Sequence, residues 1–257
     1  MRKFLLAGGA AISFIAIAGT SAIAQSPASA GGRDPQTMAA LDRMGASLRK
    51  LQSFGVRADT TEETVLANGQ KIQLSGVVDI KAKQPNGLRV DRWSDRQERS
   101  LYFDGRTVTV FSPRLGFYGS APASGSIRQA VAAVAERYGI ETPLADLFAW
   151  GEDPALVQRV TSAFYVGAET IGGNQCDHYA MRQDNVDWQV WTRQKGEALP
   201  CKLVITSTDD PSMPQYSAVF TWAPQQAHAA STFTFAPPKG SQKIELGKAP
   251  PATAMAE

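Results

Sequence analysis

Histidine and cysteine are scarce in this chain, and the scarcity limits the chemistry open to it. Of 257 residues, two are histidine (His178 and His228) and two are cysteine (Cys176 and Cys201). Neither histidine has a second metal ligand at helical or strand spacing, so we expect no metal site. Asp177 adjoins His178, but adjacent strand residues point to opposite faces. This pattern favours a partly exposed strand histidine over a catalytic pair.

Catalytic motifs are missing as well. The sequence contains no Gly-x-Ser-x-Gly nucleophile elbow and no glycine-rich phosphate loop. Asp184 and Asp187 flank a turn, where aspartate is favoured for backbone reasons. We therefore predict no catalytic residues and no cofactor, and a protein that is not an enzyme.

Long hydrophobic runs are absent after the first 25 residues. The chain opens on Met1-Arg2-Lys3, continues uncharged from Phe4 to Gln25, and carries Ala22-Ile23-Ala24 near the end of that run. A basic start, a short apolar segment and an Ala-x-Ala exit are typical of a secretory signal peptide. Its apolar core falls short of the ~20 residues that a membrane span needs. We predict a signal peptide over 1–24, cleaved after Ala24, and a periplasmic protein that does not span the membrane.

An excess of charge of one sign is also lacking. The chain has 26 basic and 24 acidic residues, and loss of Arg2 and Lys3 with the signal peptide leaves the two equal. Nucleic-acid binding requires a clear basic excess, so no nucleic-acid partner is expected. Between Arg89 and Arg106 the signs alternate and balance. That stretch predicts a solvated, salt-bridged strand face, with an anion site as the alternative.

The even cysteine count favours one disulfide. In an oxidising compartment, Cys176 and Cys201 are expected to pair. Two separate buried thiols are the alternative.

The exported part begins with a short leader and a helix. Residues 25–33 are small and turn-prone, and we expect them to be disordered, like the Ala- and Pro-rich tail 248–257. Asp34-Pro35 is typical of a helix N-cap and first position, and apolar residues follow at helical spacing over 35–51. We expect a single domain over 34–247.

From Phe54 the apolar pattern changes to a period of two. Asn68-Gly69 and Asp104-Gly105 supply the positive φ angles of tight hairpins, and such short connections indicate antiparallel pairing. The count is eleven or twelve strands. The expected runs are 54–66, 71–83, 88–93, 99–103, 107–111, 115–118, 164–171, 176–182, 187–193, 202–208, 216–222 and 232–235.

Three short helices interrupt the strands. Ser126 and Gln129 form a capping box, and further helices are expected to begin at Thr142-Pro143 and Asp153-Pro154. Their position within a meander predicts a cover over one face of the sheet. The lid residues are expected to be Ile127, Val131, Val134, Leu147 and Phe148.

Aromatic and branched residues on the strands favour an apolar ligand cavity beneath that cover. The alternative is that these side chains simply fill a core. The candidate cavity residues are Leu88, Phe103, Val108, Val110, Phe117, Trp188, Val190, Phe220 and Trp222.

Several short motifs, in order along the chain, resemble a known superfamily. They are Ser53-Phe54, Pro85-Asn86-Gly87-Leu88, Phe103-Asp104-Gly105, Val110-Phe111-Ser112-Pro113 and Phe233-Thr234-Phe235-Ala236-Pro237-Pro238-Lys239-Gly240. Over roughly 36–246 they resemble the periplasmic lipoprotein carrier LolA and its receptor relative LolB. The stretch from Cys176 to Trp191 is closer to the uncharacterised domain of unknown function 2092 family.

The resemblance implies an α+β fold: an unclosed half-barrel, here of about eleven strands, whose concave face is covered by an N-terminal helix and short lid helices. It implies a non-catalytic binding protein, or carrier, for a lipid, a lipoprotein acyl chain or a lipid-modified protein. The alternative is an envelope protein-interaction or stress-sensing module with a filled core. Carriers place an arginine before the Pro of the third strand to hold the lid; Gln84 stands there instead.

The signal peptide generates the first prediction. N-terminal sequencing of periplasmic material should return Gln25 as the first residue, because the signal peptidase reads Ala22 and Ala24. A chain that began at Met1, or at an acylated residue, would contradict the assignment.

Overall fold

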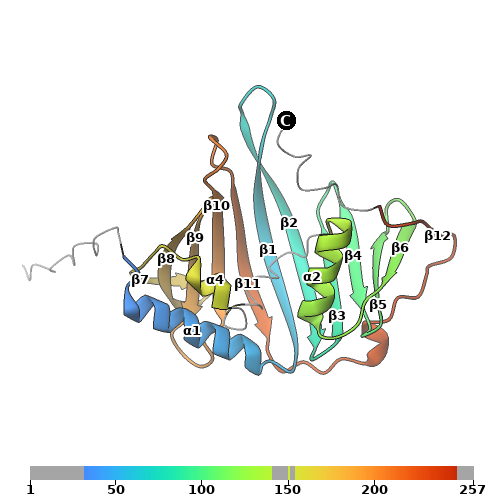
Figure 1. Cartoon of the computed structure of the whole chain (residues 1–257), viewed down its shortest axis with the longest axis horizontal. Helices are drawn as coiled ribbons and strands as arrows, with labels where there is room; N and C mark the ends of the chain where they lie inside the picture. The colour runs from blue at the N-terminus through green and yellow to red at the C-terminus, as the bar shows by residue number, and fades with distance from the viewer. Residues whose placement is uncertain (1–31, 141–149, 151–153, 248–257) are drawn as a thin grey trace, which may run out of the picture.

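The computed structural model describes residues 32–140, 150 and 154–247 (Figure 1). The signal peptide, most of the leader and the tail from 248 therefore lie outside the described residues. So do the expected helix start at Thr142-Pro143 and the lid residues Leu147 and Phe148.

Twelve strands form one curved sheet that does not close into a barrel. Their order is β12-β6-β5-β4-β3-β2-β1-β11-β10-β9-β8-β7, and β12 with β6 is the one parallel pair among the described strands. The bounds are β1 Ser53–Val65, β2 Lys71–Lys83, β3 Gly87–Trp93, β4 Glu98–Phe103, β5 Thr107–Ser112, β6 Phe117–Pro122, β7 Ser162–Ile171, β8 Asn174–Gln183, β9 Val186–Arg193, β10 Pro200–Ser207, β11 Gln215–Ala223 and β12 Gln242–Lys243. The expected half-barrel is confirmed.

The sheet consists of two meanders joined at its centre. Strands β1 to β6 form one and β7 to β11 the other, and β1 pairs with β11 from Gly55 opposite Ala223 to Glu62 opposite Tyr216. Because paired residues face the same side, this register makes the apolar face of one meander continuous with that of the other.

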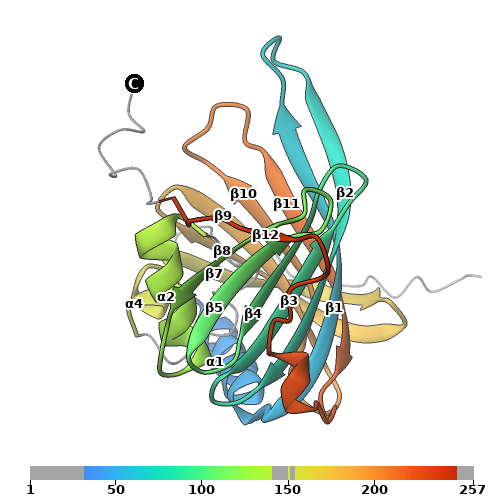
Figure 2. The same ribbon diagram turned by 90° about the vertical axis from the view of Figure 1, so that its right-hand side faces the viewer.

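The α-helices of the described residues lie on one face of the sheet (Figure 2). They are α1 Pro35–Lys50, α2 Ile127–Tyr138 and α4 Pro154–Gln158. The expected caps are present: the Asp34 carboxylate accepts from Thr37 N (2.8 Å), and Ser126 and Gln129 form the capping box. In the described ranges, no helix is both long and apolar enough to cross a membrane.

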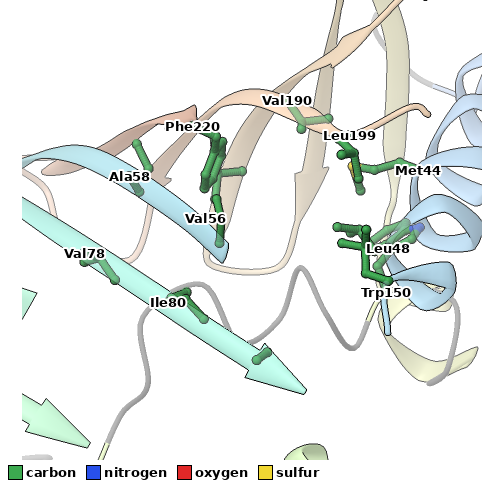
Figure 3. Close-up of a cluster of buried hydrophobic side chains, with 14 of the residues drawn as sticks. Met44, Leu48, Val56, Ala58, Val78, Ile80, Trp150, Val190, Leu199 and Phe220 are labelled. Carbon is green, nitrogen blue, oxygen red and sulfur yellow. The ribbon is translucent and has the colours of Figure 1, made fainter. Parts of the chain in front are cut away.

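The core lies between the sheet and these helices. Even-numbered residues of the central strands, such as Val56, Val78 and Ile80, are buried in the same core as Met44 and Leu48 of α1 (Figure 3). Alternate strand residues thus enter one core, as the period of two predicts.

Gly45 lets α1 approach its neighbour closely. A Cβ at this position would lie 2.7 Å from the carbonyl oxygen of Trp150 and 2.9 Å from its indole ring. The contact fixes Trp150 beside α1, where its carbonyl also accepts a hydrogen bond from Arg49 (3.0 Å).

The expected closing strand over 232–235 is wrong. A single 3₁₀ turn, Ala230–Thr232, stands there, followed by irregular chain. Phe235 packs against Tyr102, Phe111 and Tyr118 at ring-centroid distances of 5.3, 5.3 and 5.0 Å. Pro237 and Pro238 follow after Ala236 and have no N–H to donate to a neighbouring strand. The aromatic side-chain contacts of Phe235 hold the segment instead.

Two boundaries also differ from expectation. The strand expected over 115–118 begins at Phe117 and extends to Pro122, because Leu115 and Gly116 form the turn that precedes it. Gly32 and Arg33, expected to be part of a disordered leader, pair with the start of β7: Ala163 N donates to Gly32 O (3.1 Å).

The expected disulfide between Cys176 and Cys201 is confirmed, with a Cα–Cα distance of 6.7 Å. Both cysteines are buried with Trp191 and Val204 in a small cluster separate from the main core. On β8, Cys176 points to the opposite side from the inward Tyr179, and on β9, Trp191 points to the opposite side from the inward Val190. This cluster therefore lies on the outer face.

The disulfide gives the second prediction. The double variant Cys176→Ala/Cys201→Ala should lose about 3.5 kcal/mol of unfolding free energy, because the bridge closes a loop of 25 residues in the unfolded chain. Urea unfolding followed by circular dichroism measures the loss. Wild-type protein unfolded with and without reductant is the control and should show a similar difference; an unchanged midpoint in the double variant would contradict the argument.

Candidate functional site

The inner face of the half-barrel is the candidate site, and strand register builds it. Leu88 of β3 lies opposite Phe103 of β4, which lies opposite Val108 of β5. The next row joins Val90, Leu101 and Val110 in the same way. These side chains form a continuous apolar wall because paired residues share a face.

The helices enter the core to different depths. Leu41 and Met44 of α1 are fully buried in the core that this wall shares with the rest of the sheet. On α2 only Ala130 and Val134 are buried, whereas Val131 and Tyr138 remain half-buried although they pack on the same core. Helix α2 thus leaves apolar side chains accessible on its inward side.

The start of α2 is tied to the hairpin between β2 and β3. Ile127 N donates to the carbonyl oxygen of Pro85 (2.8 Å), next to Gln84. Gln84 N itself donates to Gln52 O (2.7 Å). A backbone hydrogen bond therefore anchors the start of α2 beside Gln84.

Most of the candidate cavity residues share the inner face. Leu88, Phe103, Val108, Trp188, Val190 and Phe220 are buried there, and Val110 and Trp222 are half-buried. Phe117 differs: it lies at the start of β6 and 37% of it is exposed. The lid residues Val134, Ile127 and Val131 face the same core.

Three buried polar atoms belonging to inner-face side chains have no hydrogen-bond partner in the structure: the indole nitrogens of Trp150 and Trp188 and the phenol oxygen of Tyr216. An unpaired buried donor costs roughly 1–3 kcal/mol. Burial raises the pKa of Tyr216 to about 12, so its hydroxyl stays protonated and able to donate at neutral pH. The sequence analysis did not include Trp150 and Tyr216 among the site residues. Tyr216 lies two residues before the buried Ala218 on β11, and this alternation could have indicated that it faces the core.

The outer face is polar and internally paired. Arg89 donates to Asp91 (2.8 Å), which also accepts from Ser100 (2.7 Å), and the Arg89 guanidinium lies 4.9 Å from the Tyr102 ring. These groups line a depression of about 360 Å³. Ion pairing was expected along the strand face from Arg89 to Arg106, and it is present at Arg89. The sequence did not predict the depression.

His178 lies on the outer face and is buried, not partly exposed as expected. It is 7% exposed, stacks on Trp191 at 3.8 Å, and its Nε2 is 2.9 Å from Gln189 Oε1. Its Nδ1 is 3.6 Å from Glu169, which accepts a hydrogen bond from Trp191 (2.9 Å). The aromatic stack beside the disulfide explains the burial. Over the described residues no group of three or more His, Cys, Asp or Glu side chains could hold a metal ion.

His178 gives the third prediction. Burial lowers the pKa of His178 below 6.5 in the folded protein, so at mildly acidic pH the unfolded chain takes up the proton first. The free energy of unfolding should therefore fall as the pH drops below about 6.5. Urea unfolding from pH 7.5 to 5 should show this slope in wild type and a flatter curve in His178→Gln.

Measurements at pH 7.5 are the control for this variant, because both states of the wild type are then largely neutral at His178 and any difference reports the lost stacking alone. Carboxylates with lowered pKa, such as Asp187 beside Arg182, act in a more acidic range. Equal slopes in the two proteins would contradict the role of His178.

Several solved structures match this chain at low sequence identity. The Mycobacterium tuberculosis lipoprotein LppX is 18% identical with a TM-score of 0.47, covering 76% of this chain and 98% of its own. An uncharacterised conserved protein from Thermus thermophilus is 10% identical (TM-score 0.46; 82% and 99% covered). A LolA superfamily protein from Nitrosomonas europaea is 11% identical (TM-score 0.38; 77% and 97% covered). A search of curated proteins finds no match.

A family model described as "Predicted periplasmic protein (DUF2092)" matches residues 37–247, which is most of the chain. The match confirms the resemblance carried by the stretch from Cys176 to Trp191. This chain therefore belongs to the DUF2092 family of predicted periplasmic proteins.

Proposed function

We propose that this protein is a non-catalytic periplasmic binding protein for a hydrophobic ligand, which lies between the inner face of the sheet and the helices. In this proposal the domain spans 34–247 and reaches the periplasm through a signal peptide cleaved after Ala24. A lipid or the acyl chain of a lipid-modified protein has the required chemistry.

One observation carries the proposal: apolar side chains that face the core from both sides remain half-buried. On the sheet these include Val110 and Ile205; on the helices they include Val131, Tyr138 and Leu156. Half-buried apolar groups on facing surfaces offer an apolar ligand area to bury, at roughly 25 cal/mol per Å². The depression on the outer face differs in being lined by ion-paired groups such as Arg89 and Asp91 together with the aromatic Tyr102.

Neutrality of the wall supports the same chemistry. The rows from Leu88 to Val108 and from Val90 to Val110 carry no ionisable side chain. An apolar wall with a few polar groups is typical of sites for small hydrophobic molecules. The hydrogen bond from Ile127 to Pro85 keeps α2 over these rows.

Uptake of diphenylhexatriene, a hydrocarbon whose fluorescence rises in apolar surroundings, tests the function. The mature protein should bind about one probe per chain, as a single site of this type would. The variant Val131→Glu should weaken binding at least about tenfold, because an unpaired carboxylate in an apolar wall costs several kcal/mol.

Ala132→Glu is the matched control, since Ala132 is the next residue of α2 and is exposed. Its affinity should equal that of wild type, and circular dichroism should show both variants folded. A native protein that takes up no probe would refute the proposal and favour an interaction module with a filled core.

A further inference from the structure

Two tryptophans meet inside the half-barrel with both indole N–H groups unpartnered. Trp150 is 5% exposed and Trp188 8%, and their rings meet edge to face at 5.2 Å. Neither indole nitrogen has a hydrogen-bond partner among the residues that the structure describes. Buried donors are nearly always paired in folded proteins. His178 Nδ1 and Arg193 Nε on the outer face are also buried without a partner, but Trp150 and Trp188 are two neutral donors whose rings meet inside the half-barrel, where an external acceptor could serve both.

Elsewhere this fold does provide acceptors for buried indoles. Trp191 on the outer face donates to Glu169 (2.9 Å), and Trp222 donates to the carbonyl oxygen of Pro200 (2.7 Å). The missing partners of Trp150 and Trp188 are therefore a property of one place, not of the protein's tryptophans in general.

A third unpartnered donor lies on the same row of the sheet. Trp188 of β9 is opposite Ile205 of β10, which is opposite Tyr216 of β11. Two strand spacings place Trp188 and Tyr216 about 10 Å apart. The half-buried Ile205 lies between the two, so donors flank an apolar floor.

The donors Trp150, Trp188 and Tyr216 are neutral, and the nearby cations Arg49 and Arg92 already have partners. The Arg49 guanidinium donates to the carbonyl oxygen of Trp150 (3.0 Å). Arg92, whose charge acts on Tyr216, is paired with Glu62 (2.8 Å). An indole N–H or a phenol favours a neutral oxygen acceptor here, because a carboxylate would lose its hydration without a free cation in return.

Resting on the proposed function, we propose that the ligand carries a neutral carbonyl, as in an ester or amide of an acyl chain, and that Trp188 and Trp150 donate hydrogen bonds to it. The apolar chain lies along the wall between Ile205 and Val110. The carbonyl distinguishes this ligand from a plain hydrocarbon and from a free fatty acid.

Displacement of diphenylhexatriene by methyl decanoate tests the inference in the mature protein. A neutral hydrogen bond contributes about 1 kcal/mol, so Trp188→Phe should raise the methyl decanoate concentration needed for displacement about five- to tenfold. The affinity for diphenylhexatriene, which has no acceptor, should stay unchanged. Trp150→Phe should act in the same direction.

Trp191→Phe is the matched control, because it removes an indole that already has its partner on the outer face, and it should leave ester displacement unchanged. Unaltered displacement in both Trp188→Phe and Trp150→Phe, with hydrocarbon binding intact, would overturn the inference and leave the proposed function standing. Stronger displacement by decanoate than by its methyl ester would also overturn it. A native protein that binds no diphenylhexatriene would overturn both.

Discussion

The pairing of β1 with β11 is the constraint on which the rest of the structure depends. It brings together two meanders that are separated in the chain by the helical segment, and Ser53 bonds to Gln226 across 173 residues at its end. Without this pairing each meander would expose one apolar edge and one half of an apolar face. With it, α1 and α2 lie over the same continuous surface (Figure 1).

Unpaired buried polar atoms occur on both faces of the sheet, but in different surroundings. On the outer face, His178 Nδ1 and Arg193 Nε have no hydrogen-bond partner among the described residues, while other groups there pair at close range: Asp91 accepts from both Arg89 and Ser100, and Glu169 accepts from Trp191. On the inner face, Trp188 and Tyr216 keep unpaired donors within an apolar wall. The inner-face donors are therefore distinguished by their apolar surroundings and not by the lack of a partner alone.

Local chemistry decided what could be predicted from the sequence. Caps, hairpin turns and alternation depend on residues close in the chain, so α1, α2, most strands and the inward side of Leu88 or Val190 were predictable. Phe117 followed the alternation but lies at a strand end, where 37% of it stays exposed. The burial of His178 depends on a stack with Trp191 from another strand, and the meeting of Trp150 with Trp188 depends on Gly45 of α1. Such contacts have no signature in the sequence alone.

A barrel that stays open keeps two strand edges, and an unpaired edge can template the addition of a strand from another molecule. Here the chain's own flanking segments pair with part of each edge. Gln242 and Ile244 donate to the backbone carbonyls of Gly116 and Tyr118 along β6 (2.8 Å each), while Gly32 and Asp34 bond to Ala163 at the start of β7. The segments before and after the half-barrel thus occupy part of the two edges at which a strand of another molecule could add.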